Sequence, residues 1–223
     1  MQRTALANRK LPDYTRGEEI FNMVSHIVGG GLGVLVLAIS VTYSAIWRDA
    51  WAVVGSSIYG ASMIMLYTIS SVYHGLREGL AKKVLQVLDH CTIYFLIAGT
   101  YTPILLCAIR RFNPFLAWTV FGIEWGLTAL AATLTAIDLK KYSKFSFVCY
   151  IGMGWCIIMA AKQTVYALSA AGFLWILAGG IAYTIGAVFY GAGRNVRYMH
   201  SVFHLFVVLG SALQFIGIIF YAL

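Results

Sequence analysis

The chain has 223 residues, of which 61% are hydrophobic and 11% charged, and its mean hydropathy is +0.81. Soluble domains are about half apolar and a quarter charged, so this excess of apolar residues cannot be buried in one core of this size. The composition excludes an ordinary soluble enzyme, a disordered chain and a disulfide scaffold. It predicts a protein that crosses a membrane several times. The net charge of +8 is therefore interpreted by its distribution across the membrane, and nucleic acid is not an expected partner.

Residues 1–19 are a short polar segment without an apolar run and cleavage site, so we expect no cleaved signal peptide. Seven apolar segments follow, each long enough to cross roughly 30 Å of hydrocarbon. The predicted spans are about 20–46, 51–73, 86–108, 114–137, 145–167, 173–192 and 200–221. All connections are short, including a Ser/Ala/Gly turn near 169–172. We therefore expect residues 20–223 to form one all-α domain, a bundle of seven transmembrane helices.

The basic residues predict the orientation of this bundle. With the N-terminus inside, four of the 16 basic residues fall outside, namely Arg48, Arg110, Arg111 and Lys162. The positive-inside rule then predicts a cytoplasmic N-terminus and an external C-terminus, the reverse of a G-protein-coupled receptor. The inner residues are Arg3, Arg9, Lys10, Arg16, Arg77, Lys82, Lys83, Lys140, Lys141, Lys144, Arg194 and Arg197.

Ionisable groups gather at the cytoplasmic ends of three predicted spans, and such groups within spans mark functional sites by default. His74 ends the second span, Asp89 and His90 begin the third, and His200 and His204 begin the seventh. His200 and His204 lie one helical turn apart on one face, a spacing that allows both to bind one metal ion. The alternative interpretation is that these are amphipathic residues at the membrane interface.

Three histidines with a vacant fourth position are typical of catalytic zinc, although imidazoles also accept other metals. Ser70 lies one turn before His74, so its hydroxyl and the imidazole share a helix face. Asp89 is predicted to orient a ligand, or to hold and deprotonate a water.

Other features have structural interpretations. Glu124 and Lys162 are expected to form an ion pair, with Lys162 reaching toward the outer surface. Gln214 is expected to form an interhelical hydrogen bond, and Gly29-x-x-x-Gly33 and Gly122-x-x-x-Gly126 to allow close helix packing. The four cysteines form no CxxC pair and are expected to be small buried residues.

Five motifs together resemble a known family. They are Glu18-Glu19-Ile20-Phe21-Asn22 with Ser25-His26, Ser70-Ser71-Val72-Tyr73-His74, Asp89-His90-Cys91-Thr92-Ile93-Tyr94, Ala98-Gly99-Thr100-Tyr101-Thr102-Pro103, and His200-Ser201-Val202-Phe203-His204. In this order they resemble the bacterial hemolysin III proteins of the progestin and adipoQ receptor (PAQR) family, which includes the adiponectin receptors. The resemblance runs from about residue 16 to the last span.

The resemblance implies a seven-helix fold with a cytoplasmic N-terminus, and a zinc ion (Zn2+) bound by His74, His200 and His204. It also implies that Asp89 lies near a zinc-bound water with Ser70 close by, and it suggests kinship with the alkaline ceramidases, which are membrane amidases. His26, His90 and the pair Glu18 and Glu19 also match the bacterial pattern without an implied role, and Glu19, His26 and His90 are further site candidates.

Our hypothesis from the sequence is zinc-dependent hydrolysis of a lipid amide or ester at the cytoplasmic leaflet of a bacterial plasma membrane, with membrane lipids as partners. The first alternative is a non-enzymatic factor for membrane fluidity or energetics, in which zinc is structural. A pore-forming hemolysin fits poorly with seven uncleaved apolar spans. A ligand receptor ranks last, because no extracellular domain is expected.

Overall fold

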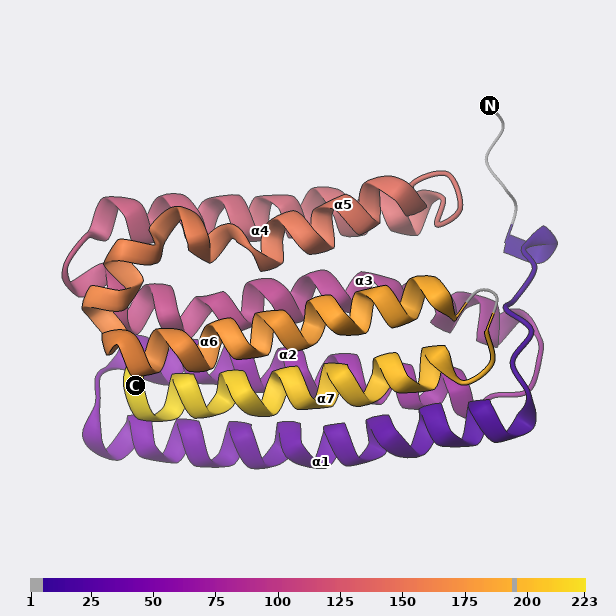
Figure 1. Cartoon of the computed structure of the whole chain (residues 1–223), viewed down its shortest axis with the longest axis horizontal. Coiled ribbons are helices and arrows are strands. Elements are labelled where there is room, and N and C mark those ends of the chain that lie inside the picture. The colour runs from indigo at the N-terminus through magenta and orange to yellow at the C-terminus, as the bar shows by residue number, and fades with distance from the viewer. Residues whose placement is uncertain (1–5, 194–195) are drawn as a thin grey trace.

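The computed structural model describes residues 6–193 and 196–223, and within them all regular structure is helical (Figure 1). The expected inner residues Arg3 and Arg194 lie outside the described part. The α-helices are α1 Arg16–Trp47, α2 Ala50–Gly75, α3 Leu80–Pro103, α4 Pro114–Ile137, α5 Ser143–Gly154, α6 Ala161–Ala192 and α7 Met199–Gly217. Short 3-10 helices are η1 Leu6–Asn8, η3 Ile109–Arg111 and η4 Cys156–Ala160, and π-helices are η2 Ile104–Ala108 and η5 Ile218–Ala222.

Six stretches of the described chain are helical, long and apolar enough to cross a membrane. One of them, Ser143–Ala192, has 50 residues, more than twice the length that one crossing requires. Its helix α6 is interrupted at Ser169, whose φ of 65° is not helical. This break falls at the expected Ser/Ala/Gly turn, and Figure 1 shows the chain doubling back between the labelled α5 and α6.

Two helices begin earlier than expected. Helix α1 begins at Arg16 because Thr15 and Glu18 form a capping box, in which each side chain bonds the backbone N–H of the other. Helix α3 begins at Leu80, so residues 80–85, expected to be part of a connection, are helical. Both extensions bring charged side chains to the ends of the bundle.

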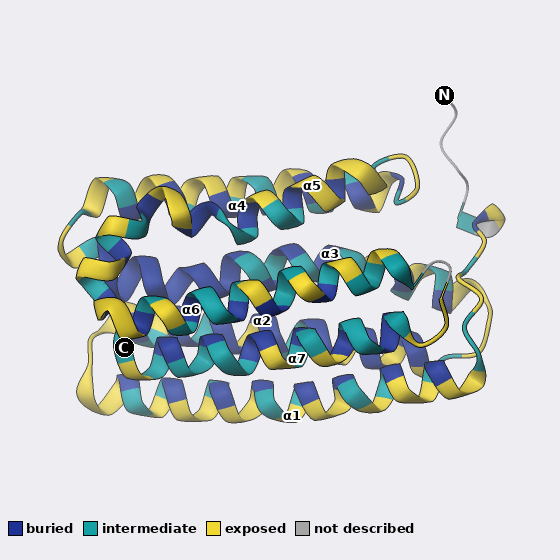
Figure 2. Ribbon diagram, in the orientation of Figure 1, coloured by how far each residue is buried: buried dark blue, intermediate teal, exposed yellow. Residues whose placement is uncertain are grey.

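The outer faces of the helices are exposed (Figure 2), and many of the exposed side chains are large and apolar, whereas the interior holds polar residues beside an apolar core. On α1, Val28 is 63% exposed and Leu35 58%, whereas Asn22 and Ser40 are fully buried. Water would disfavour this arrangement, but lipid tails accept the apolar face without cost. The burial pattern therefore agrees with a membrane-spanning bundle.

Close helix packing occurs at one of the two expected glycine pairs, and also at glycines such as Gly60 that the sequence did not single out. A Cβ atom at Gly29 would lie 2.5 Å from the Tyr67 ring, and one at Gly60 would lie 2.7 Å from the Leu37 backbone. By contrast, Gly122 and Gly126 have nothing within 4 Å and are exposed on α4. The prediction that Gly122-x-x-x-Gly126 packs against another helix is therefore wrong for the described chain, because this face points outward.

The alternating direction of the helices brings four of their ends together. Helices α1, α3 and α7 begin, and α2 ends, at the same end of the bundle, while the C-terminus lies at the opposite end (Figure 1). Residues far apart in the sequence thus share one polar layer.

Candidate metal centre

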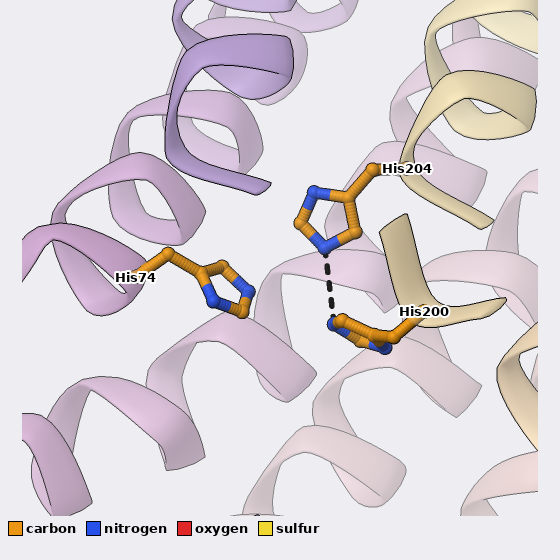
Figure 3. A group of neighbouring side chains, drawn as sticks. All are labelled: His74, His200 and His204. Carbon is orange, nitrogen blue, oxygen red and sulfur yellow. Dashed lines mark hydrogen bonds between the residues drawn. The ribbon is translucent and has the colours of Figure 1, made fainter. Parts of the chain in front are cut away.

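Three buried histidines converge at this shared end. His74 is on the last turn of α2, and His200 and His204 are on the first two turns of α7. One nitrogen from each ring lies within 4.8 Å of the other two. Figure 3 shows the rings turned toward a common point, and the Nε2 atoms of His200 and His204 are 3.1 Å apart.

The geometry of these donors fits a tetrahedral metal ion. Zinc binds imidazole nitrogen at about 2.0–2.1 Å, so two such ligands lie roughly 3.3–3.4 Å apart in a tetrahedral site. Two imidazole lone pairs as close as those of His200 and His204 repel each other unless a cation or a proton lies between them. His74 Nε2 is buried and has no hydrogen-bond partner among the described residues, so it is available as the third ligand. The three-histidine group can hold a metal ion.

The start of α7 is held in place by α1. Glu18 Oε1 accepts a hydrogen bond of 2.7 Å from the backbone N–H of Tyr198, and Glu18 Oε2 accepts one of 3.3 Å from Arg197. Tyr198 has a φ of 63°, in the left-handed region, so the chain turns sharply just before α7. These contacts, together with the helical spacing, place both α7 histidines on the face that meets α2.

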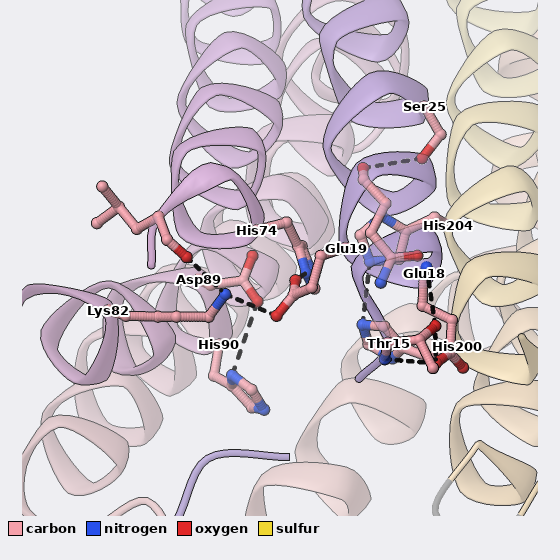
Figure 4. Close-up of polar contacts among 12 residues, drawn as sticks. Thr15, Glu18, Glu19, Ser25, His74, Lys82, Asp89, His90, His200 and His204 are labelled. Carbon is pink, nitrogen blue, oxygen red and sulfur yellow. Dashed lines mark hydrogen bonds and ion pairs between the residues drawn. The ribbon is translucent and has the colours of Figure 1, made fainter. Parts of the chain in front are cut away.

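Glu19 is the residue that orients His74. Its Oε2 lies 2.6 Å from His74 Nδ1, and its Oε1 accepts a hydrogen bond of 2.6 Å from Lys82 Nζ (Figure 4). A carboxylate at Nδ1 keeps the proton on that nitrogen, which leaves the Nε2 lone pair free for a metal. The Lys82 ammonium also donates to the carbonyl of Leu76, at 2.9 Å. A charged pair thus links α1 and α3 to the end of α2.

The sequence marked Glu19 as a candidate without a role and treated Lys82 only as an inner-side charge. What pointed to Glu19 in the sequence was its place beside Glu18, as the second of two acidic residues directly before the first predicted span. A buried lysine has no comparable signature, because lysines near span ends ordinarily extend into water.

Asp89 and His90 lie on α3 near this centre. The nearest oxygen of Asp89 is 3.8 Å from His90 Nδ1, which is also 2.8 Å from the carbonyl of Gln86. His90 Nε2 lies 3.2 Å from the hydroxyl of Tyr190, whose ring is 5.7 Å from that of His200. Asp89 is not part of the three-histidine group.

Two other expected residues are buried on the neighbouring helices α2 and α1. Ser70 is 1% exposed and lies one turn before His74 on α2. The ring of His26, from α1, stacks on that of His204 at 3.7 Å and contacts Tyr67 edge-on. His26 thus packs directly against one of the three histidines.

The segment before α1 covers the centre, which sequence reasoning missed. The ring of Tyr14 stacks on His200 at 4.9 Å with an interplanar angle of 20°, and lies 5.9 Å from the His74 ring. Burial raises the pKa of Tyr14 well above its usual range, so the phenol stays neutral. In the sequence, this role was indicated only by the presence of an aromatic residue, Tyr14, within the polar segment 1–19.

The expected pair of Glu124 and Lys162 does not form within the described chain. Both carboxylate oxygens of Glu124 are buried without a hydrogen-bond partner among the described residues. Lys162 lines a hollow with Asn113, at the start of α4. Glu124 follows Asn113 by eleven residues, about 16 Å along a helix. The two charges therefore lie at different depths.

The prediction for Gln214 is not confirmed for its side-chain oxygen, which is buried without a partner among the described residues. The four cysteines are free and buried, as expected.

The helical bundle and the three-histidine group define a multi-pass membrane protein with a candidate metal centre. Residues 14–215 match the family model described as Haemolysin-III related, so the chain belongs to that family.

Among its relatives, Hemolysin-3 of Bacillus cereus is 39% identical over 206 residues, covering 92% of each chain. A Hemolysin-3 homolog of Bacillus subtilis (strain 168) is 35% identical, covering 93% of this chain and 96% of the relative. The more distant ADIPOR-like receptor IZH2 of Saccharomyces cerevisiae is 24% identical, covering 92% and 72%. These likenesses and the helical stretches make this chain a bacterial multi-pass membrane protein.

Proposed function

We propose that the protein is a zinc-dependent hydrolase that cleaves an amide or ester bond of a membrane lipid at the cytoplasmic leaflet. The observation that carries this proposal is the convergence of three buried imidazole nitrogens within 4.8 Å, with His74 oriented by a carboxylate. Structural zinc sites usually have four protein ligands, whereas catalytic sites have three and leave one position for the reaction.

The proposal includes the topology. The break at Ser169 supports two crossings within Ser143–Ala192, which gives seven crossings in all. An odd number places the termini on opposite sides, and the positive-inside rule favours a cytoplasmic N-terminus. The metal centre then lies on the cytoplasmic side, together with the basic residues Lys82 and Arg197.

Each residue near the centre has a role in this scheme. A zinc ion bound by the three histidines would polarise the scissile carbonyl and activate water for attack. Asp89 takes the proton of the attacking water and passes it to the leaving group. Ser70 donates a hydrogen bond to the negative charge that develops on the carbonyl oxygen. Glu19 holds His74, and Tyr14 shields the site from bulk water.

A second function is favoured by the burial of the centre. All three histidines are buried and Tyr14 covers His200. A metal in this position would also join α2 to α7 without any reaction. In that case the protein is a non-enzymatic factor for membrane fluidity or energetics.

The experiment reconstitutes the purified protein into lipid vesicles and measures zinc content and lipid turnover by mass spectrometry. We expect Asp89→Ala to retain zinc and lose turnover, and His204→Ala to lose both. The matched control is Glu78→Ala, which removes an exposed carboxylate and should retain both. Turnover that Asp89→Ala leaves unchanged contradicts the hydrolase, and zinc without turnover in the wild type favours the second function. Dye leakage from the same vesicles tests the lytic activity that the name of the Bacillus cereus relative suggests.

A further inference from the structure

Glu124 is a second functional candidate, far from the three histidines. It follows the first residue of α4, Pro114, by ten positions and precedes the last, Ile137, by thirteen, so it lies near mid-membrane. It is 0% exposed, and neither carboxylate oxygen has a hydrogen-bond partner among the described residues. A carboxylate that is both charged and unpaired in such a place is strongly unfavourable. The side chain therefore needs a cationic ligand or a proton.

The groups that face Glu124 carry no positive charge. Within the described part of the chain, its titratable neighbours are the Cys156 thiol from η4 and the Tyr101 phenol from α3. Both are neutral groups under ordinary conditions. Lys162 lies near the start of α4, at another depth.

The backbone around Glu124 departs from regular α-helix on two sides. After Pro103, α3 continues as the π-helix η2, and after Gly154 the chain forms the 3-10 helix η4. The Tyr101 hydroxyl bridges the second break, donating to the carbonyl of Gly154 at 3.0 Å and accepting from the N–H of Ile157 at 2.8 Å. Irregular backbone at membrane depth is tolerated where it is buried or lines a polar site, and π-helical turns are frequent at functional sites.

A metal cation is a poor ligand for this place. Hard cations such as Ca²⁺ take six or more oxygen ligands. The carbonyl of Gly154 is already engaged by Tyr101, and the Thr102 hydroxyl donates to Ala98 and accepts from Trp125. A single proton needs only the carboxylate itself.

We propose that Glu124 is an intramembrane proton-binding site. The site is independent of the three histidines and of the proposed hydrolysis. A variant that loses the Glu124 proton site should still bind metal at the three histidines, and a variant that loses the metal should keep the proton site.

Infrared spectroscopy of the protein in lipid nanodiscs tests the site. At neutral pH the wild type should show the carbonyl band of a protonated carboxylic acid, shifted in D2O. Glu124→Gln, which keeps the shape of the protonated acid, should lose the band. Glu78→Gln, which changes an exposed carboxylate, should retain it. A folded wild type without the band, or a band that persists in Glu124→Gln, would overturn the proposal.

If Glu124→Gln does not fold, a second measurement on the wild-type protein tests the same site. The chain has four glutamates, Glu18, Glu19, Glu78 and Glu124, so carboxyl-labelled glutamate gives four carbon signals in a solid-state NMR spectrum. Glu18 and Glu19 are paired with cations and Glu78 is exposed. We expect one protonated signal at neutral pH, and four ionised signals would contradict the site.

Discussion

The region formed by α1, α2 and α7 differs from α4 in how its polar and small residues are used. In the first region, Glu18 and Glu19 each connect two or more elements, and Gly29 and Gly60 allow close approach of neighbouring groups. On α4, Gly122 is exposed, and the Glu124 carboxylate has no partner among the described residues. A metal centre needs ligands held rigidly, whereas a proton site needs only a buried carboxylate. The two regions are therefore expected to respond differently to substitution.

The largest effect is expected from removal of a ligand in the first region. His204→Ala should reduce bound zinc from about one ion per chain to nearly none, because two imidazoles alone bind weakly. Mass spectrometry of the purified protein measures the metal directly. His90→Ala is the matched control and should retain the metal, since His90 is outside the three-histidine group. Equal loss in both variants would contradict the assignment of ligands.

The next effect concerns the carboxylate behind His74. Glu19→Ala should weaken zinc binding by about 10- to 100-fold, the usual consequence of removing an outer-shell partner of a metal ligand. Competition with a chelator of known affinity measures this change. Glu78→Ala removes an exposed carboxylate from the same end of the bundle, so an equal loss there would indicate a general charge effect instead.

A smaller effect compares the packing of the two regions. Gly60→Ala should destabilise the protein by about 1–3 kcal/mol, because its Cβ would lie 2.7 Å from the Leu37 backbone. Gly122→Ala should be neutral or stabilising by up to about 1 kcal/mol, since alanine favours helix and nothing lies within 4 Å. Thermal unfolding in detergent measures both. Equal changes in stability for the two variants would contradict the difference in packing between the two regions.

The smallest effect is expected at the cover of the centre. Tyr14→Ala removes a stacked ring worth about 0.5–1.5 kcal/mol and should weaken zinc binding by roughly 2- to 10-fold. Tyr14→Phe retains the ring and should bind zinc as the wild type does. Chelator competition distinguishes them, and a large loss in Tyr14→Phe would mean that the hydroxyl, not the ring, is important.

The sequence predicted the membrane class from local patterns, and it grouped the three histidines from helical spacing, the predicted topology and the family resemblance. Apolar length marks the spans, and the spacing of His200 and His204 places them on one face. The partners of the ligands depend on side-chain geometry between distant helices, so Lys82 and Tyr14 were missed. The pairing of Glu124 with Lys162 was wrong because opposite charge in neighbouring spans does not specify depth.

The central claim is that three imidazole nitrogens bind one metal ion at the shared helix ends. X-ray absorption at the zinc edge, on the zinc-loaded protein in nanodiscs, tests it most directly. We predict three imidazole nitrogens and one further light atom at about 2.0–2.1 Å. Sulfur ligands, a six-coordinate hydrated ion, or a protein that takes up no zinc would contradict the claim.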